Sequence, residues 1–213
     1  MPEHRIPKHD PGSHWDAVYT SRDYSLLSWH QVYPLESLEL IEVSGISADS
    51  PVIDVGGGSS LLADCLLHQG YGNISVLDCS SEALQLARTR LGSMAEEIKW
   101  IVADIRHFRP EKKYMLWHDR AVFHFMVAQD DRKKYIETLD ASLDENGHIV
   151  IGTFALGGPP RCSGLDVMRY DETLVSEVFA PAFMVVSTMF ARHRTSTGER
   201  QDFMFFYLRR SHA

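Results

Sequence analysis

Three aspartates, Asp54, Asp78 and Asp104, each lie at or near the end of a short apolar segment. Short apolar runs of this kind are typical of buried parallel strands. The carboxyl ends of parallel strands meet at one edge of an open sheet, where ligands bind, and in dinucleotide folds an acid after the second strand holds the ribose hydroxyls. Three acids in phase therefore predict a ligand site at this edge, with Asp54 supplying a fixed negative charge.

Three consecutive glycines, Gly56, Gly57 and Gly58, follow the first of these apolar runs. Glycine lacks a Cβ atom, so the backbone here can approach a ligand closely, although a glycine cluster can also form an ordinary tight turn. Pyrophosphate-binding turns carry a further glycine where this chain has Leu61. The carboxylate of Asp54 would also repel a pyrophosphate. These residues favour a ligand with a positive end.

The segment 54–60, Asp-Val-Gly-Gly-Gly-Ser-Ser, resembles the first motif of the class I S-adenosylmethionine-dependent methyltransferases, acid-x-G-x-G-x-G. Ser60 replaces the third glycine, and the resemblance extends over about residues 52–154. It implies S-adenosylmethionine as cofactor, with glycines under its methionine part, an acid on its ribose and a further acid at its adenine. The expected cofactor-binding residues are Trp15, Tyr19, Trp29, Asp54, Gly56, Gly57, Gly58, Ser60, Asp78, Cys79, Asp104, Ile105 and His118.

The chain before the first strand is rich in aromatic residues, among them Trp15, Tyr19 and Trp29. The transferable methyl group of the cofactor sits on a sulfonium cation, and aromatic faces attract desolvated cations by about 2 kcal/mol or more. We therefore expect residues 1–48 to form a lid or helical segment over the cofactor. A helix that docks on the sheet through its tryptophans is a compatible alternative.

The expected catalytic residues are His118, Asp119 and His124, because they follow the fourth apolar run at the ligand edge. Methyl transfer depends mainly on alignment of the acceptor. It needs a base only when the acceptor arrives protonated. A hydrogen-bonded structural role is the usual alternative for a single histidine. On a helix, six steps would separate His118 from His124 by 240°, so we expect no metal site.

The segment 155–169 is rich in glycine and proline and leaves the fifth strand at the ligand edge. Long loops of this composition are often functional, and we expect this one to line an acceptor pocket. Cys162 is interpreted as a packed residue, since no base accompanies it in sequence. His193 is a weaker candidate for assisting the acceptor. The expected acceptor-binding residues are His30, Arg161, Arg169 and Tyr170.

Strand and helix signals alternate from residue 52 onward, as in βαβ units. We expect strands at 52–55, 74–77, 98–103, 114–117 and 148–154, a turn at 144–147, and helices at 61–67, 80–91, 136–143 and 171–179. Two final β runs, 183–191 and 203–208, are joined too closely for a parallel crossover and must be antiparallel. With the resemblance, this predicts an α/β fold: a Rossmann-like seven-stranded sheet, mostly parallel, with one antiparallel strand near the edge and helices on both faces.

The length of 213 residues suits one domain, 1–213. With 21 basic and 29 acidic residues the net charge is −8, which argues against a nucleic-acid partner. No run approaches the roughly 18 apolar residues of a membrane span. Three scattered cysteines do not suggest a disulfide framework. We expect a soluble, cytoplasmic protein with no membrane partner, and the oligomeric state stays open.

The favoured acceptor is a small molecule, with a thiol or other soft nucleophile slightly preferred. The pair Trp29-His30 is similar to thiopurine and related thiol methyltransferases. A protein lysine is the alternative, since Trp15-Asp16-x-x-Tyr19 resembles the start of elongation-factor lysine methyltransferases, and Asp119 matches the acid of a further motif. An NAD-dependent oxidoreductase is a remote alternative, and a module that only senses the cofactor stays open.

Overall fold

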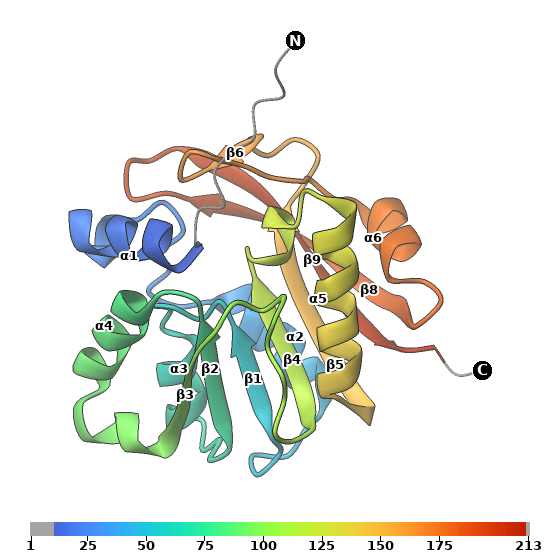
Figure 1. Ribbon diagram of the computed structural model, residues 1–213, viewed down its shortest axis with the longest axis horizontal. Coiled ribbons are helices and arrows are strands. Elements are labelled where there is room, and N and C mark those ends of the chain that lie inside the picture. The colour runs from blue at the N-terminus through green and yellow to red at the C-terminus, as the bar shows by residue number, and fades with distance from the viewer. Residues whose placement is uncertain (1–10, 212–213) are drawn as a thin grey trace.

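The computed structural model describes residues 11–211 and contains a seven-stranded sheet in the order β3-β2-β1-β4-β5-β9-β8 (Figure 1). The strands are β1 (Val52–Val55), β2 (Ile74–Asp78), β3 (Ile98–Val102), β4 (Tyr114–Arg120), β5 (Leu143–Phe154), β6 (Arg161–Cys162), β7 (Leu165–Asp166), β8 (Phe183–Arg194) and β9 (Arg200–Arg210). The helices are α1 (Pro11–Ser21), α2 (Leu35–Ser44), α3 (Leu62–His68), α4 (Ser81–Leu91), α5 (Gln129–Ser142) and α6 (Glu172–Phe179). Three 3₁₀ turns complete them: η1 (Tyr24–Leu26), η2 (Gly92–Glu97) and η3 (Phe123–Phe125).

Strands β1 to β5 run parallel, whereas β9 pairs antiparallel with both β5 and β8. The predicted sheet with one antiparallel strand near its edge is therefore confirmed. The short connection between β8 and β9 forms the predicted hairpin, with both strands longer than expected.

Alternation along the strands divides the core into two layers. Val52 of β1 packs into the layer that contains residues of α2, α3 and α4, whereas Ile53 packs into the layer of α5 and α6. Figure 1 shows α5 in front of the sheet and α2 behind it. This two-sided burial explains why the parallel strands read as continuous apolar runs.

The helix α4 begins as the sequence indicates. The hydroxyl of Ser80 accepts a hydrogen bond from the backbone nitrogen of Ala83 at 3.0 Å, which is an N-cap. Leu84, Ala87 and Leu91 form its buried side. This cap places the end of β2 and the start of α4 at the ligand edge.

Four expected features of the secondary structure were wrong. The fourth strand continues to Arg120, and Leu143 begins β5 instead of ending a helix. The expected turn at 144–147 belongs to β5, where the pairing with β4 changes register. The expected irregular loop 155–169 contains the β6–β7 hairpin.

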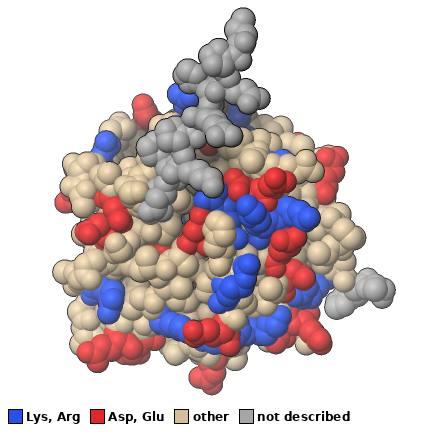
Figure 2. Space-filling model, viewed as in Figure 1, with Lys and Arg blue, Asp and Glu red and all other residues tan. Residues whose placement is uncertain are grey.

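No helix among residues 11–211 is both long and apolar enough to cross a bilayer. Acidic and basic side chains are interspersed over the face that Figure 2 shows. That pattern provides no continuous basic track for a phosphate backbone on this face.

Candidate active site

A cavity of about 700 Å³ opens along the carboxyl edge of the sheet, beneath α1. At one end it is lined by Asp78, Cys79, Asp104 and Ile105, which follow β2 and β3. At the other end it reaches residues of β5, β9 and the β6–β7 hairpin. The structure therefore brings the acids of two neighbouring strands into one site.

The glycine turn after β1 lies between these two ends. Gly56 has φ +65°, and a Cβ atom there would lie 1.9 Å from Cγ2 of Val122. A Cβ atom on Gly57 would lie 2.6 Å from both the Asp54 carboxylate and the Val76 side chain. Glycine is thus required at both positions by contacts within the protein, and Gly56 itself lines the cavity.

Ser60, the departure from the glycine motif, has a structural use. Its hydroxyl accepts a hydrogen bond from the backbone nitrogen of Leu62 at 3.1 Å, near the start of α3. Arg90 donates to the carbonyls of Ser59 and Ser60 at 2.8 and 2.7 Å. A second, smaller cavity of about 40 Å³ is lined by Gly57, Ser60, Asp54, His118 and His30.

Asp78 is almost enclosed, with 8% of its surface exposed, yet its side chain lines the large cavity. One carboxylate oxygen accepts a hydrogen bond from the backbone nitrogen of Ser80 at 2.8 Å. Burial raises the pKa of Asp78 to about 6, and the nearby charge of Asp54 adds to this effect. The carboxylate is therefore an acceptor for hydroxyl groups in a poorly solvated place.

Asp104 is already paired in the structure. Nε and Nη2 of Arg106 donate to its carboxylate at 3.0 and 2.5 Å, and Arg106 also reaches Asp131 at 3.2 Å. Burial alone would raise the pKa of Asp104, but the hydrogen bonds and charge of Arg106 outweigh it and lower that pKa. Asp104 and the buried Ile105 still form one wall of the cavity.

The helix α1 covers this edge of the sheet and lies against α4 (Figure 1). The carboxylate of Asp16 accepts hydrogen bonds from the Ser80 hydroxyl at 2.6 Å and from the Glu82 backbone nitrogen at 3.1 Å. Asp16 therefore anchors α1 to the first turn of α4. By contrast, α2 packs on β4 and β5 and is not part of the cover.

Three aromatic residues expected in the lid meet at the cavity. The rings of Trp15 and Trp29 are in edge contact at 5.7 Å, and Tyr19 contacts Trp29 at 6.2 Å. Trp15 also contacts Phe125 of η3 at 5.2 Å. All four line the cavity, so its upper wall is aromatic.

His118 and Asp119 were expected to follow the fourth strand. In the structure they lie inside β4. In the register of β1 and β4, His118 pairs with Asp54 and Asp119 with Val55, which places the two side chains on opposite faces of the sheet. Both are buried, and neither lines the large cavity. Direct contact of these two side chains with an acceptor does not fit the structure.

His118 and Asp119 are both hydrogen-bonded to other residues of the chain. Nδ1 of His118 lies 2.7 Å from the Asp54 carboxylate, and its Nε2 lies 2.9 Å from the Ser37 hydroxyl. Asp119 accepts hydrogen bonds from the Tyr135 hydroxyl at 2.5 Å and from the Val122 backbone nitrogen at 2.9 Å. Burial raises the pKa of Asp119 to about 6.

His124 is also buried, between the rings of Phe125 and Phe154, at 4.5 and 4.8 Å. Within residues 11–211 neither ring nitrogen has a hydrogen-bond partner. Burial, with the nearby charge of Arg120, lowers the pKa of His124 to about 3. The imidazole does not line the cavity, so the expected catalytic role does not fit this position either.

None of the four expected acceptor-binding residues lines the large cavity. His30 lines the smaller one. Arg161 is exposed and pairs with Asp166 at 2.7 Å, and Arg169 donates to two carbonyls of its own loop. Tyr170 is a core residue against Phe123.

His193 lies on β8, where its Nε2 donates to the Ser28 carbonyl at 2.7 Å. The hairpin expected to line the pocket does contribute, but through Cys162, Leu165 and Asp166. These three residues could not be selected from the sequence, because nothing in the segment 155–169 indicated a hairpin.

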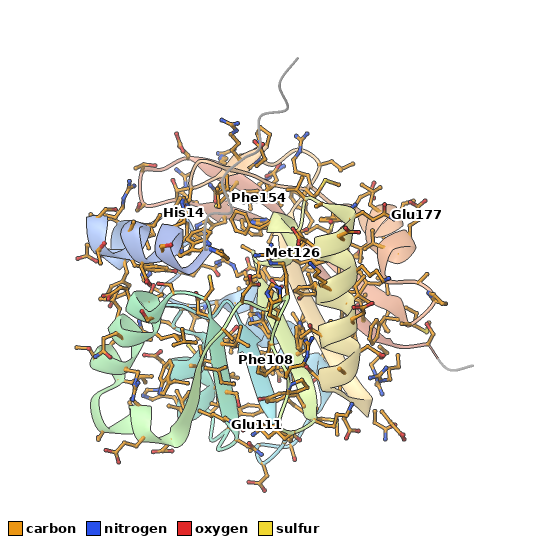
Figure 3. The ribbon with its side chains drawn as sticks, viewed as in Figure 1. His14, Phe108, Glu111, Met126, Phe154 and Glu177 are labelled. Carbon is orange, nitrogen blue, oxygen red and sulfur yellow. The ribbon has the colours of Figure 1, made fainter. Side chains whose placement is uncertain are left out.

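Sequence reasoning also missed several residues of the cavity wall. His14, Met126 and Phe154, labelled in Figure 3, line it, as do Arg120 and Phe203. Arg120 had a usable signal: it is a cation three residues after the apolar run 114–117, at the end of β4. Among residues 11–211, His14 is the histidine that lines the large cavity, and its Nε2 has no hydrogen-bond partner there.

Residues 52–147 match the family described as "Methyltransferase domain". This segment of the chain is similar to a methyltransferase domain, and the seven-stranded sheet around it is the fold that the resemblance to class I S-adenosylmethionine-dependent methyltransferases implies. Within the part of the chain that the structure describes, no three His, Cys, Asp or Glu side chains are grouped to hold a metal.

Curated relatives cover parts of the chain. Malonyl-[acyl-carrier protein] O-methyltransferase 1 of Ilyobacter polytropus is 29% identical over 136 residues, 63% of this chain and 48% of that protein. The human EEF1A lysine methyltransferase 2 is 27% identical over 157 residues, 65% of each chain. The chain thus spans about half the length of the first of these relatives.

Solved structures share the fold across almost the whole chain. A protein studied for the conversion of a disulfide bond into a thioacetal group in echinomycin biosynthesis superposes with a TM-score of 0.76 at 17% identity, over 94% of this chain and 91% of that chain. The Burkholderia thailandensis 1,6-didemethyltoxoflavin-N1-methyltransferase, with its acceptor and S-adenosylhomocysteine bound, gives a TM-score of 0.70 at 16% identity, over 100% and 94%.

Proposed function

We propose that this protein transfers a methyl group from S-adenosylmethionine to a small-molecule acceptor, with a thiol or other soft nucleophile slightly preferred. The observation that carries the proposal is the continuity of the large cavity. Its acidic end at β2 and β3 suits an adenosyl group, and its aromatic end at β5 and β9 leaves room for a second molecule. A volume of about 700 Å³ lies within the range of small-molecule sites, about 300–1,000 Å³.

The residues present fit the donor. The glycine turn follows β1 at the ligand edge, and the backbone of Gly56, which has no side chain, lines the cavity where the donor would lie. Asp78 offers a buried carboxylate to the ribose hydroxyls. When bound, S-adenosylmethionine supplies an activated methyl group on a sulfonium sulfur.

The chain's own part in the reaction is to align the acceptor and exclude water. Trp15, Tyr19 and Trp29 cover the middle of the cavity, where their faces stabilise positive charge. Alignment of a nucleophile alone supplies several kcal/mol of a barrier. For an acceptor that arrives protonated, such as a thiol, the imidazole of His14 is the group placed to take the proton.

The comparisons support this choice without naming one acceptor. The toxoflavin enzyme is named for an N-methylation of a small molecule, and the echinomycin protein for sulfur chemistry. The Ilyobacter relative is named as an O-methyltransferase of malonyl-acyl carrier protein, so carboxylate acceptors belong to the panel to be tested.

A protein lysine is the second candidate, and the similarity to human EEF1A lysine methyltransferase 2 favours it. The net charge of −8 suits a basic partner. Incubation of an extract with methyl-labelled cofactor separates the two. Label in the small-molecule fraction supports the first proposal, and label confined to protein bands supports the second.

Calorimetry with S-adenosylmethionine and S-adenosylhomocysteine tests the donor site directly. We expect binding to the wild-type protein, a loss of at least tenfold in Asp78→Ala, and no change in the exposed control Asp49→Ala. Absence of binding to the wild-type protein would overturn the proposed function.

A further inference from the structure

Arg120 is a half-buried cation that forms no ion pair with the described residues, although the charges of Glu36 and Asp54 act on it at longer range. No carboxylate among residues 11–211 lies within ion-pair distance of its guanidinium. Nη1 donates to the carbonyl of Trp29 at 2.9 Å, whereas Nε is buried and has no hydrogen-bond partner in the described part of the chain. Enclosing a charge in this way is costly unless something compensates it.

The guanidinium lies toward the acceptor end of the cavity. Its central carbon is 5.0 Å from the ring centroid of Phe203, a residue of β9. In the sheet order β1-β4-β5-β9, this ring lies two strands beyond β4, on the side away from β2 and β3. The acids expected to hold adenosine are at the opposite end, and Arg120 lines the cavity between Gly56 and Phe154.

One edge of the Arg120 guanidinium has no hydrogen-bond partner among residues 11–211. Nη1 is engaged by the backbone, and the face of the guanidinium packs on Phe203. The Nε and Nη2 edge carries the two parallel N–H groups that match a carboxylate. Burial lowers the pKa of Arg120 to about 10, so the group remains a cation at neutral pH.

We propose that Arg120 binds an anionic group, such as a carboxylate, on the methyl acceptor. This inference rests on the proposed function and narrows it to acceptors that carry a negative charge near the reacting atom. The aromatic walls of Phe154 and Phe203 favour a planar or apolar body attached to that charge.

The competing occupant is the carboxylate of the cofactor itself. Arg120 also lines the smaller cavity beside the glycine turn, where the methionine part is expected. The contact with Phe203 favours the acceptor, because it places the guanidinium carbon 5.0 Å from a ring of β9, which lies on the side of β4 away from the glycine turn. The experiment must therefore measure both ligands.

The test uses benzoate and benzamide, which have similar shapes and differ in charge, added to the protein saturated with S-adenosylhomocysteine. We expect the wild-type protein to bind benzoate at least tenfold more tightly than benzamide. Arg120→Gln should abolish this difference while it leaves S-adenosylhomocysteine binding within twofold. The control Arg192→Gln removes an exposed arginine and should behave as the wild type.

Two results would overturn the proposal. One is equal binding of benzoate and benzamide to the wild-type complex, which needs no variant and so does not depend on whether Arg120→Gln folds. The other is a loss of S-adenosylhomocysteine binding in Arg120→Gln with unchanged binding of 5′-methylthioadenosine, which lacks the carboxylate. Failure of S-adenosylhomocysteine to bind the wild-type protein would instead reject the proposed function itself.

Discussion

Nδ1 of His118 donates to the carboxylate of Asp54 at 2.7 Å, and each residue is only 2% exposed. Ser37 of α2 completes the chain of contacts at the other ring nitrogen. The acid that opens the glycine motif is therefore held by a histidine from the neighbouring strand, within the layer that α2 covers. This contact positions the motif; it does not place His118 at the acceptor.

Removing the imidazole should destabilise the fold. His118→Ala leaves Asp54 as a buried carboxylate without its partner, and we expect a loss of about 3 kcal/mol in the free energy of unfolding. Urea denaturation measures it, with the exposed His68→Ala as the control. In a double-mutant cycle with Asp54→Asn the two losses should not add. Full stability with abolished turnover would instead restore a catalytic role to His118.

Asp78→Asn should change stability and binding in opposite directions. Burial raises the pKa of Asp78 to about 6, above its value in an unfolded chain, so its contribution to stability is present below about pH 4 and is lost as the pH rises through 6. At pH 8 the variant should therefore be more stable in the ligand-free form by about 3 kcal/mol, and at pH 4 it should show no gain.

The same substitution should weaken S-adenosylhomocysteine binding at least tenfold at pH 8, because a neutral amide is a poorer acceptor for ribose hydroxyls. Thermal unfolding measures the change in stability, and calorimetry on the same preparation measures the change in affinity for S-adenosylhomocysteine. A variant that lost stability and kept its affinity would remove Asp78 from the donor site.

Gly56→Ala should disrupt the turn. A methyl group there would meet Val122 at 1.9 Å, and the φ of +65° is unfavourable for alanine. We expect a loss of at least 2 kcal/mol in the free energy of unfolding, with greatly weakened donor binding. Gly72→Ala is the matched control, because nothing lies within 4 Å of its added Cβ atom. Equal stability of the two variants would contradict this account of the turn.

His124→Phe should stabilise the protein. The substitution removes two buried ring nitrogens without partners, which is worth about 1 kcal/mol at pH 8. Because burial lowers the pKa of His124 to about 3, the wild-type protein also loses stability as the pH falls below about 6.5, and the variant lacks this loss. Unfolding measured from pH 8 to pH 5 should show the difference widening. Loss of turnover without this trend would support the catalytic role expected from sequence.

The sequence predicted the sheet well because its strands are buried on both faces and end at recognisable acids and glycines. The cap at Ser80 was found because a serine before an amphipathic run has a local cause. Local sequence patterns fail to predict where an element ends when contacts with distant residues determine its length. Polar residues such as His118 and Asp119 usually indicate the end of a buried strand. Here β4 includes both of them, because residues of α2 and α5 satisfy their hydrogen bonds.

The acceptor side was less predictable for a related reason. The residues that line it come from β4, β5, β9 and the β6–β7 hairpin, which are far apart in sequence. Arg161 and Arg169 were chosen by residue type, but one pairs at the surface and the other holds its own loop. Arg120 could be placed only once the strand order had brought Phe203 to its side.

Ser80 touches both the cover and the ribose acid: its hydroxyl donates to Asp16 of α1, and its backbone nitrogen donates to Asp78. Binding of the donor's ribose to Asp78 should therefore stabilise the contact between α1 and the start of α4. We therefore predict ordered binding, with the donor before the acceptor and S-adenosylhomocysteine released last, which product-inhibition kinetics would test.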